Sequence, residues 1–493
     1  MFPFKTSISI DRRLQQPVYL QIANQLIELI TARKLPPETK LPGSRTLADL
    51  LKVHRKTIVA SYDELLLQGW LESIPKRGTF VHRKLPEFNG LDFSDQTEQS
   101  VLSAGFSYND HPGLKDPHVV SDDHWTRIND GISDERLAPV NELARIYRRI
   151  AAQTASWKHL SYGSTYGDEQ LRAVLVSYLN KTRGLKITKD QLLITRGSQM
   201  GIYLSSQLLL NKQDNIVVGR TNYSTADLTF SHHKATIHRV SVDSDGLLTD
   251  EIEVLCKQMQ IKAVYLTSHH HHPTGVTLSA ERRIHLLNLA SRYHFAIIED
   301  DYDYDFNYNQ APILPLASHD QGGHVVYIGS VCKTVAPVFR VGYLVAPAAF
   351  VDEAARLRRI IDRQGDALLE RTFAEFIQTG DLDRHIRKVL KIYKQRRDLI
   401  CSLLKRELSA YFSFDIPKGG MALWVTLDKK YSWSAVAKAA RRYQLEIGHW
   451  QRYDRANSGH NAIRIGFARY NDAEIRSLVD KLKMTLQQLD AKT

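Results

Sequence analysis

Between positions 191 and 328 the chain carries five short apolar runs, each separated from the next by a longer stretch with helical spacing. Runs of this length are typical of strands buried on both faces, and helices between them favour parallel pairing. The pattern predicts an α/β domain with a mostly parallel sheet. The predicted strands are Gln191–Thr195, Asn215–Gly219, Ala263–Leu266, Phe295–Glu299 and Val325–Ile328. Ligands of such sheets bind at the carboxyl ends of the strands, so polar residues there are candidates for a site.

Lys333 follows the last of these runs and has apolar neighbours, among them Val331, Val335 and Ala336. A single lysine after a strand is usually a solvated surface residue. An apolar setting lowers the pKa of an amine, however, and a partly neutral lysine is what Schiff-base chemistry requires. We therefore predict that Lys333 is a catalytic residue. The adjacent Cys332 is expected to pack rather than to react, because nothing near it marks an activated thiol.

The preceding predicted strand ends in Glu299-Asp300-Asp301-Tyr302. An aspartate beside a pyridine nitrogen keeps that nitrogen protonated, which makes the ring an electron sink. Asp300 can take this role, and Tyr302 can hydrogen-bond a ring hydroxyl. Together with Lys333, these residues predict a site for pyridoxal 5'-phosphate (PLP).

A phosphate site is predicted next to the first strand. Gly197-Ser198-Gln199 precedes a helix expected to start at Met200, and backbone N–H groups at a helix start bind phosphate. Ser330 and Arg340 are further donors suited to phosphate. We expect Ser198, Gln199, Ser330 and Arg340 to bind the cofactor.

Positive charge is concentrated in residues 1–84, which hold 14 Lys and Arg against 7 Asp and Glu, in a chain with a net charge of +12. Such a segment is either a solvated basic face or a site for a polyanion, and charge alone does not decide between them. The hydrophobic spacing is more specific. It predicts a helix after Pro17, a second helix capped by Ser44 with Leu47, Leu50 and Leu51 facing inward, and a third helix from about His54.

Two short strands, 70–74 and 79–81, follow these helices, with a basic turn at Pro75-Lys76-Arg77-Gly78 between them. Three helices and a hairpin with a cationic tip are typical of a winged helix-turn-helix. The segment resembles the GntR-type winged helix. The motifs that carry the resemblance are Leu41-Pro42-Gly43-Ser44-Arg45, Arg55-Lys56-Thr57-Ile58-Val59, Tyr62-Asp63-Glu64-Leu65, Gly69-Trp70-Leu71 and Gly78-Thr79-Phe80-Val81.

This resemblance implies that the segment binds double-stranded DNA. The residues expected to contact DNA are Arg45, Arg55, Lys56, Thr57, Arg77 and Gly78. The wing formed by Arg77 and Gly78 is expected to enter a minor groove. His54 stands where the family usually has Ser or Thr, so a weaker helix cap is expected there.

Residues 105–490 resemble a fold-type-I aminotransferase, and the whole chain resembles the MocR family of regulators. The matching segments include Tyr162-Gly163, Gly197-Ser198-Gln199, Tyr223, Pro273-Thr274-Gly275, Glu299-Asp300-Asp301-Tyr302-Asp303, Lys333 with Arg340, and Arg464-Ile465-Gly466-Phe467. The organisation expected is a DNA-binding domain at 1–84, a linker at 85–104 and a PLP-binding domain at 105–493.

The resemblance also implies roles for single residues. Lys333 is expected to hold PLP as an internal aldimine, Asp300 to pair with the ring nitrogen, and Tyr223 to stack on the ring. Arg464 is expected to bind the carboxylate of an amine or amino-acid-like effector. His272 occupies the place where aminotransferases carry an Asn that bonds the ring oxygen, so slow transamination is expected.

The same resemblance implies a homodimer, arranged head to tail, because fold-type-I sites are completed by a neighbouring subunit. No metal site is expected: the run His269–His272 is consecutive, and residues in an extended chain point alternately to opposite sides. Three scattered cysteines, no signal peptide and no long apolar stretch are features of a cytoplasmic protein without a membrane span.

Three functions remain open at this stage. The chain is a regulator whose PLP domain senses an effector, an active aminotransferase with an accessory DNA-binding domain, or a DNA-binding protein with a vestigial PLP site. The winged helix favours the first over the second. Lys333, Asp300 and Arg464 favour the first over the third.

Overall fold

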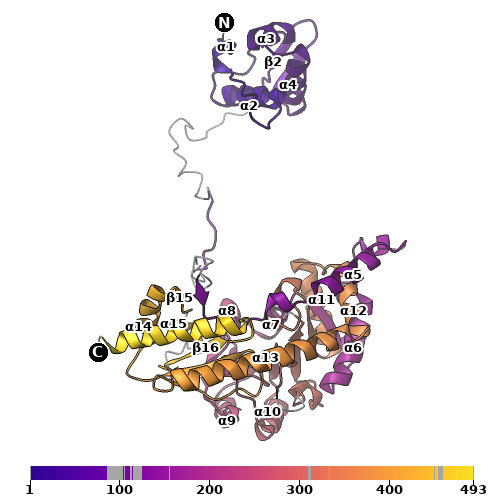
Figure 1. Cartoon of the computed structure of the whole chain (residues 1–493). Helices are drawn as coiled ribbons and strands as arrows, with labels where there is room; N and C mark the ends of the chain where they lie inside the picture. The colour runs from indigo at the N-terminus through magenta and orange to yellow at the C-terminus, as the bar shows by residue number, and fades with distance from the viewer. Residues whose placement is uncertain are drawn as a thin grey trace. The chain divides into compact units, whose positions relative to one another are not determined.

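The computed structural model describes residues 2–85, 104, 106–111, 114, 125–154, 156–308, 313–331, 333–448, 450–453 and 459–491. They form two compact units, Met1–Asp110 and His111–Thr493 (Figure 1). The predicted linker at 85–104 lies outside the described residues except at its two ends, and Cys332 lies outside them as well. No helix among the described residues is long and apolar enough to cross a bilayer.

The first unit is a winged helix-turn-helix, as predicted. Its elements are α1 Phe4–Ser7, α2 Val18–Thr31, α3 Ser44–Leu51, α4 Arg55–Leu67, β1 Leu71–Ile74 and β2 Gly78–Val81. The two strands pair antiparallel. Ile22, Leu26, Leu47, Ile58 and Leu65 are fully buried and form the core between the helices. Burial of such apolar side chains is what stabilises a unit of this size.

Two local predictions in this unit are wrong, namely the cap at Ser44 and the inward-facing Leu50. Ser44 does not cap α3: Gly43 takes the extended cap position, so Ser44 is already helical, and its hydroxyl instead accepts a hydrogen bond from Arg55 Nε at 3.3 Å. His54 does cap α4, with Nδ1 accepting from the Lys56 N–H at 3.1 Å. An imidazole Nδ1 lies as many bonds from the backbone as an Asn oxygen, so it can serve as the acceptor. Leu50 is exposed, because the buried face of this short helix is formed by Leu47 and Ala48.

The second unit is built on a seven-stranded sheet with strand order β4-β12-β11-β10-β9-β5-β6. Its strands are β4 Leu192–Thr195, β5 Asn215–Gly219, β6 Thr236–Val240, β9 Ile261–Leu266, β10 Ala296–Asp301, β11 Val325–Ser330 and β12 Gly342–Val345. Only β12 runs against its neighbours among these strands. The predicted mostly parallel α/β fold is confirmed. β6 and β12 were not predicted from the sequence.

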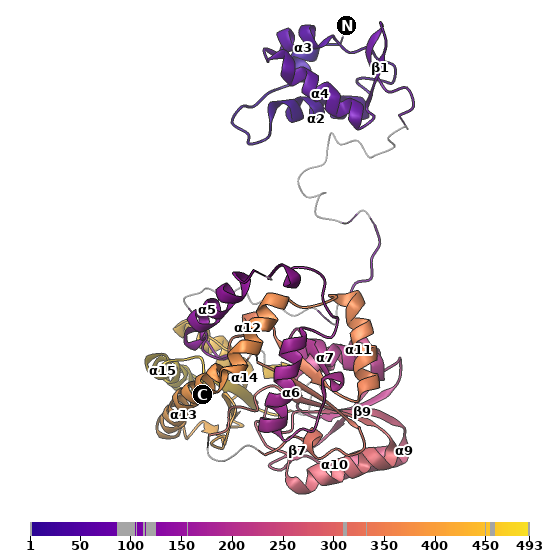
Figure 2. The same cartoon turned by 90° about the vertical axis from the view of Figure 1, so that its right-hand side faces the viewer.

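Helices cover both faces of this sheet (Figure 2). Alternate strand residues enter different cores: Val217, Val264 and Ile297 pack on one face, and Ile216 and Ile298 on the other. The helices of the first face are α6 Glu169–Arg183, α9 Thr249–Gln258, α10 Ala280–Tyr293 and α12 Ala367–Gln378. Those of the second face are α7 Ser198–Leu209, α8 Ser224–His232 and α11 Ala348–Ile361. Burial on both faces explains why the strands read as continuous apolar runs.

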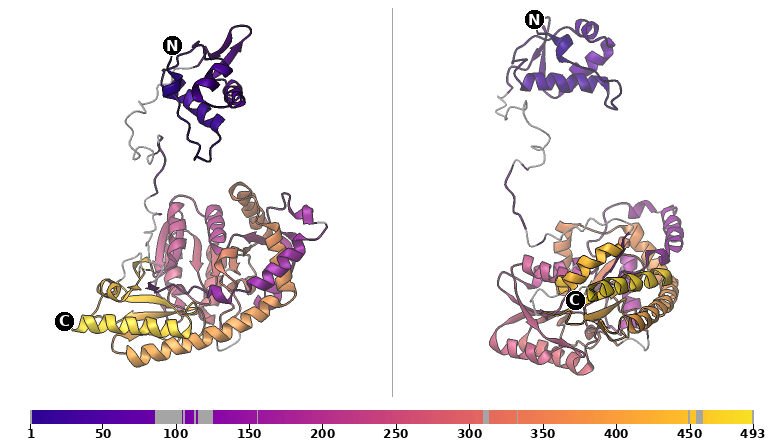
Figure 3. Two further views of the ribbon diagram at one scale, coloured as in Figure 1. Left: turned by 45° about the horizontal axis from the view of Figure 1, so that its top comes forward. Right: turned by 60° about the vertical axis from the view of Figure 1, so that its left-hand side comes forward.

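The C-terminal part of this unit has its own core around a three-stranded sheet. Its elements are α13 Asp381–Glu407, β13 Phe412–Ser413, β14 Ala422–Leu427, α14 Trp433–Ala440, β15 Leu445–Glu446, β16 Ala462–Gly466 and α15 Asp472–Asp490. Helices α13 and α15 lie side by side (Figure 3). The strand β3, Thr126–Arg127, pairs with β15, so residues around 130 belong to this C-terminal part although they precede the large sheet in sequence. The remaining elements are α5 Val140–Ala151, β7 Val242–Asp243 and β8 Gly246–Leu247.

Candidate functional site

A cavity of about 90 Å³ lies at the carboxyl ends of β9, β10 and β11. This is where ligands bind in α/β sheets. Six of the predicted site residues line it: Ser198, Tyr223, His272, Asp300, Tyr302 and Lys333. Three residues that the sequence reasoning missed line it as well, namely Asp130, Tyr265 and Thr267.

Asp300 is buried near the end of β10, and only one of its two carboxyl oxygens accepts a hydrogen bond from a described residue. The hydroxyl of Tyr265, on the neighbouring strand, donates to Oδ2 at 3.0 Å. Oδ1 is buried and has no hydrogen-bond partner among the described residues. Burial is the main cause that raises the pKa of Asp300 to about 7, and Asp301 and Asp303 add to it. A buried carboxyl oxygen without a donor suits a protonated ring nitrogen, which would supply both the proton and the opposite charge.

Lys333 reaches the same cavity from the loop after β11. Its Nζ donates to the backbone carbonyl of Gly131 at 3.1 Å and lies 6.0 Å from the centre of the Tyr302 ring. The neighbouring side chains of Val335 and Ala336 are buried, as the sequence suggested. The loop therefore places an amine and a carboxyl group, Lys333 and Asp300, in one small cavity.

Aromatic and imidazole rings complete the walls. Tyr223 immediately precedes α8, and its ring meets the His272 ring edge to face, with centroids 5.3 Å apart. Burial lowers the pKa of His272, although Asp130 opposes this. Tyr302 donates to the carbonyl of His270 at 3.3 Å and accepts from Arg464 Nη2 at 3.2 Å. A flat ligand in this cavity would contact ring faces or edges on more than one side.

The predicted phosphate residues are only partly brought together. α7 starts at Ser198, two residues before the predicted start, and Ser198 lines the cavity. Gly197 has a φ of +75°, and a Cβ there would lie 2.9 Å from Arg340 Nη2, so Arg340 packs directly against the helix start. By contrast, the Gln199 amide donates to Thr229 Oγ1 at 2.9 Å, and the Ser330 hydroxyl donates to the Val341 carbonyl at 3.3 Å. Neither side chain lines the cavity.

Arg464, on β16, does not line the cavity either. Its side chain is only 2% exposed. Nη1 donates to the Pro273 carbonyl at 2.9 Å, Nη2 donates to Tyr302, and Nε lies 3.4 Å from Asp130 Oδ1. The guanidinium is thus already held by protein acceptors.

Asp130 sits between Arg464 and His272. Its Oδ2 lies 3.1 Å from His272 Nε2, and its Oδ1 accepts from the Tyr453 hydroxyl at 2.9 Å. The sequence offered no signal for this residue, because Asn129-Asp130-Gly131 lies outside every predicted element and more than 300 positions from Arg464. Tyr265 could have been found, since it lies near the carboxyl end of a predicted strand.

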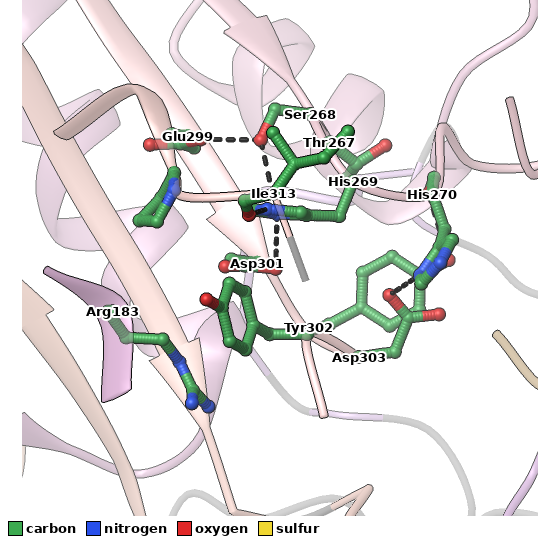
Figure 4. Close-up of polar contacts among 12 residues, drawn as sticks. Arg183, Thr267, Ser268, His269, His270, Glu299, Asp301, Tyr302, Asp303 and Ile313 are labelled. Atoms are coloured by element: carbon green, nitrogen blue, oxygen red, sulfur yellow. Dashed lines mark hydrogen bonds and ion pairs between the residues drawn. The ribbon is translucent and has the colours of Figure 1, made fainter. Parts of the chain in front are cut away.

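The four consecutive histidines are all buried, and each has a different partner. His269 lies 3.1 Å from Asp301, and His270 lies 2.8 Å from Asp303 (Figure 4). His271 Nε2 lies 2.9 Å from the Thr221 carbonyl oxygen, and His272 contacts Asp130 as described. Within the described ranges, no group of three or more His, Cys, Asp or Glu side chains could hold a metal ion.

The candidate DNA surface of the first unit is exposed. Arg45 lies on α3, Arg55 and Lys56 in the first turn of α4, and Arg77 and Gly78 at the tip of the hairpin, and all five are exposed. Thr57 is half-buried. The hydrogen bond from Arg55 to Ser44 links the first turns of α3 and α4. Donors at a helix N-terminus and on a wing can reach phosphates and base edges.

Comparison with known proteins identifies relatives of both units. The model of the aminotransferase class I and II family matches residues 131–482, and that of bacterial regulatory proteins of the gntR family matches residues 18–81. The HTH-type transcriptional regulator YisV of Bacillus subtilis is 27% identical over 93% of this chain and 93% of its own. The probable rhizopine catabolism regulatory protein MocR of Rhizobium meliloti is 24% identical over 98% of this chain and 96% of its own.

Among solved structures, a kynurenine aminotransferase of Pyrococcus horikoshii, in complex with PMP, is 26% identical. It covers 74% of this chain and 91% of its own, with a TM-score of 0.70. The match is therefore to nearly the whole of that aminotransferase chain.

Proposed function

Because the chain belongs to the aminotransferase class I and II family and also carries a GntR-family DNA-binding domain, we propose that it is a transcription regulator that senses an amine or amino-acid-like effector through its PLP domain. The resemblance to MocR-family regulators is confirmed by relatives that match both parts together. The proposed organisation is a DNA-binding domain at 1–84, a linker at 85–104 and a sensor domain at 105–493.

The residues of the cavity fit PLP, which is the cofactor indicated by the family and its solved members. The observation that carries this is the buried Oδ1 of Asp300, to which no described residue donates, in the same cavity as Lys333. Lys333 would bond to the cofactor, Asp300 would hold a proton at the ring nitrogen, and Tyr223 would lie against the ring. The remaining proposed cofactor contacts are Ser198, Gln199, Tyr302, Ser330, Arg340 and His272. Bound there, PLP supplies an electrophilic carbon that reacts reversibly with primary amines.

The test is a screen of amines and amino acids against the full-length, PLP-loaded protein. We expect at least one compound to change the visible absorption of the cofactor and, at the same concentration, to change the affinity for a DNA target. An effector can shift DNA binding only by its differential affinity for two states, typically about 1–3 kcal/mol. A screen in which no compound alters the spectrum would contradict the sensing role.

A second candidate, an active aminotransferase, is favoured by the presence of both Lys333 and Asp300 in the cavity. His272 argues against efficient turnover. Its Nε2 already contacts Asp130, so it is not available to bond a ligand. We expect multiple-turnover transamination to be slow. Steady-state assays with several amino donors would measure it, and turnover at ordinary enzyme rates of about 1–1,000 s⁻¹ would favour the second candidate.

DNA binding of the full-length chain is expected to weaken steeply as salt rises, because phosphate contacts release counterions. Arg55→Ala should cost about 1–3 kcal/mol of binding free energy if the arginine reads a base. The matched control is Lys34→Ala, which removes an exposed charge outside α3, α4 and the wing. Fluorescence anisotropy at several salt concentrations measures both effects. An Arg45/Arg55 double alanine variant with normal affinity and specificity would show that the recognition elements are misassigned.

We further propose that the protein is a homodimer, arranged head to tail, in which each winged helix lies over the partner's large domain. A symmetric dimer presents two DNA-binding domains and matches a DNA site with two-fold symmetry. Sedimentation velocity at micromolar concentration with PLP bound should give a single species of twice the chain mass. A monomer under these conditions would sink the proposal.

A further inference from the structure

The helix α13 holds the surplus positive charge of the chain after residue 84. It carries nine Lys and Arg against four Asp and Glu. Outside this helix, residues 85–493 hold Lys and Arg in the same number as Asp and Glu. A charged helix face is usually only solvated, but a surplus that is concentrated in one helix points to a polyanion as partner.

Most of this charge lies on one face of α13, which runs along the outside of the second unit (Figure 1). The opposite face is anchored in the C-terminal core by buried side chains, among them Val389, Ile400 and Leu404. With 3.6 residues per turn, the exposed cations fall within about a third of the circumference of the helix. These cations are Arg384, Arg387, Lys388, Lys391, Lys394, Lys405 and Arg406.

Four of these cations, which we call the basic face, have no carboxylate to neutralise them. Among the described residues, no Asp or Glu forms an ion pair with Arg387, Lys388, Lys391 or Lys394. The one exposed carboxylate of α13, that of Asp398, already contacts Arg397 Nη2 at 2.6 Å. The basic face therefore presents its full charge to solvent.

The spacing of these cations suits the phosphate backbone of duplex DNA, which carries a negative charge about every 1.7 Å of its axis. Arg387 and Lys394 lie seven residues apart, or about 10 Å along the helix axis. Lys405 and Arg406 extend the charge to about 29 Å from Arg387. That length is close to one turn of the duplex, about 34 Å.

We infer that the basic face of α13 is a second DNA-binding surface, which contacts phosphates outside the sequence held by the winged helix. This inference rests on the proposed function, since the winged helix supplies sequence recognition and raises the local concentration of duplex around the second unit. Phosphate contacts add affinity but carry no sequence information. The basic face therefore strengthens binding to long duplexes without changing the preferred sequence.

The test compares a short duplex with a long one. The preferred sequence is first selected from a random duplex library with the full-length, PLP-loaded protein. It is then placed in the shortest duplex that contains it, and in one extended on each side by about 20 base pairs, or two helical turns. We expect the parent protein to bind the long duplex at least tenfold more tightly in fluorescence anisotropy, with a steeper salt dependence.

The variant Arg387→Gln/Lys388→Gln/Lys391→Gln/Lys394→Gln removes the four charges and keeps side chains that favour a helix. It should bind the short duplex within about twofold of the parent and the long duplex at least tenfold more weakly. On the long duplex, the slope of log affinity against log salt should become shallower by about 3–4, because each lost phosphate contact removes about 0.9. The swap Arg387→Lys/Lys388→Arg/Lys391→Arg/Lys394→Arg keeps every charge and should behave as the parent.

The matched control changes four exposed lysines elsewhere in the second unit to Gln, namely Lys181, Lys186, Lys212 and Lys429. It removes the same charge and should bind both duplexes as the parent does. Vesicles of phosphatidylglycerol test a membrane as the alternative partner. If the basic-face variant lost vesicle binding but bound the long duplex normally, the face would belong to a membrane and the inference would be overturned.

The two possible failures are distinguishable. If the selection yields no preferred sequence and the parent protein binds neither duplex, the proposed regulatory function fails, and the inference fails with it. If the parent binds the short duplex but gains nothing from the extension, or if the basic-face variant gains as much as the parent, the function stands and the role of α13 is refuted.

Discussion

Lys333→Ala should abolish the response of DNA binding to an effector. Without the amine, PLP can be held only by non-covalent contacts, and the effector has no lysine to compete with. DNA affinity in the absence of effector should stay within about twofold of the parent value, because none of the cavity residues belongs to the unit Met1–Asp110. The visible absorption of the bound cofactor and anisotropy on a DNA target measure the two parts of this prediction.

The matched control is Lys212→Ala, which removes an exposed lysine from the same unit. It should retain both the cofactor absorption and the effector response. A Lys333→Ala variant that still responds fully on DNA would refute the role of PLP as the switch. Equal and absent responses in the parent and both variants would instead favour a vestigial PLP site.

Asp300→Asn should have two opposite effects. PLP affinity should fall at least tenfold, because a neutral amide cannot balance the charge of a protonated ring nitrogen. The PLP-free protein, however, should become more stable at pH 8, by an amount on the order of 1–3 kcal/mol, because a buried and half-satisfied carboxylate is removed.

The pH dependence of the second effect follows from the pKa of Asp300, which is about 7 in the folded chain, whereas the ordinary pKa of an aspartate is 3.8. A carboxyl group with a raised pKa favours the protonated folded state, so its destabilising effect grows as pH rises above 3.8 and is complete above 7. The gain from Asn should therefore be larger at pH 8 than at pH 5. Denaturant titrations of the PLP-free parent and variant at both pH values measure it, and an equal or smaller gain at pH 8 would contradict the assignment.

The large sheet could be predicted because its strands are buried on both faces and therefore appear in the sequence as continuous apolar runs. Asp300 and Lys333 could be predicted for a related reason: each follows a recognisable strand, and parallel strands bring their carboxyl ends to one edge. β12, Gly342–Val345, was missed because no α-helix separates it from β11, so the alternation of strands and helices does not mark it.

Asp130 could not be predicted, because its position depends on the pairing of β3 with β15, two strands of two residues each. Such short strands have no periodicity to detect. The cap of α3 was mispredicted by a single residue. A shift of one residue at Ser44 changed a capping side chain into a helical one, and boundaries of that precision lie below what spacing resolves.

The pairing of β3 with β15 has a consequence for ligand binding. Asp130 and Arg464 are both anchored to the small C-terminal sheet, since the Gly466 N–H donates to the Asn129 carbonyl at 2.8 Å. Asp300 and Lys333 are anchored to the large sheet. A ligand that contacts residues of both ends therefore joins the two hydrophobic cores of one compact unit, and its length has to match the distance between them. Adding or removing one methylene is therefore expected to change the affinity of such a ligand, and calorimetry on a homologous series would measure it.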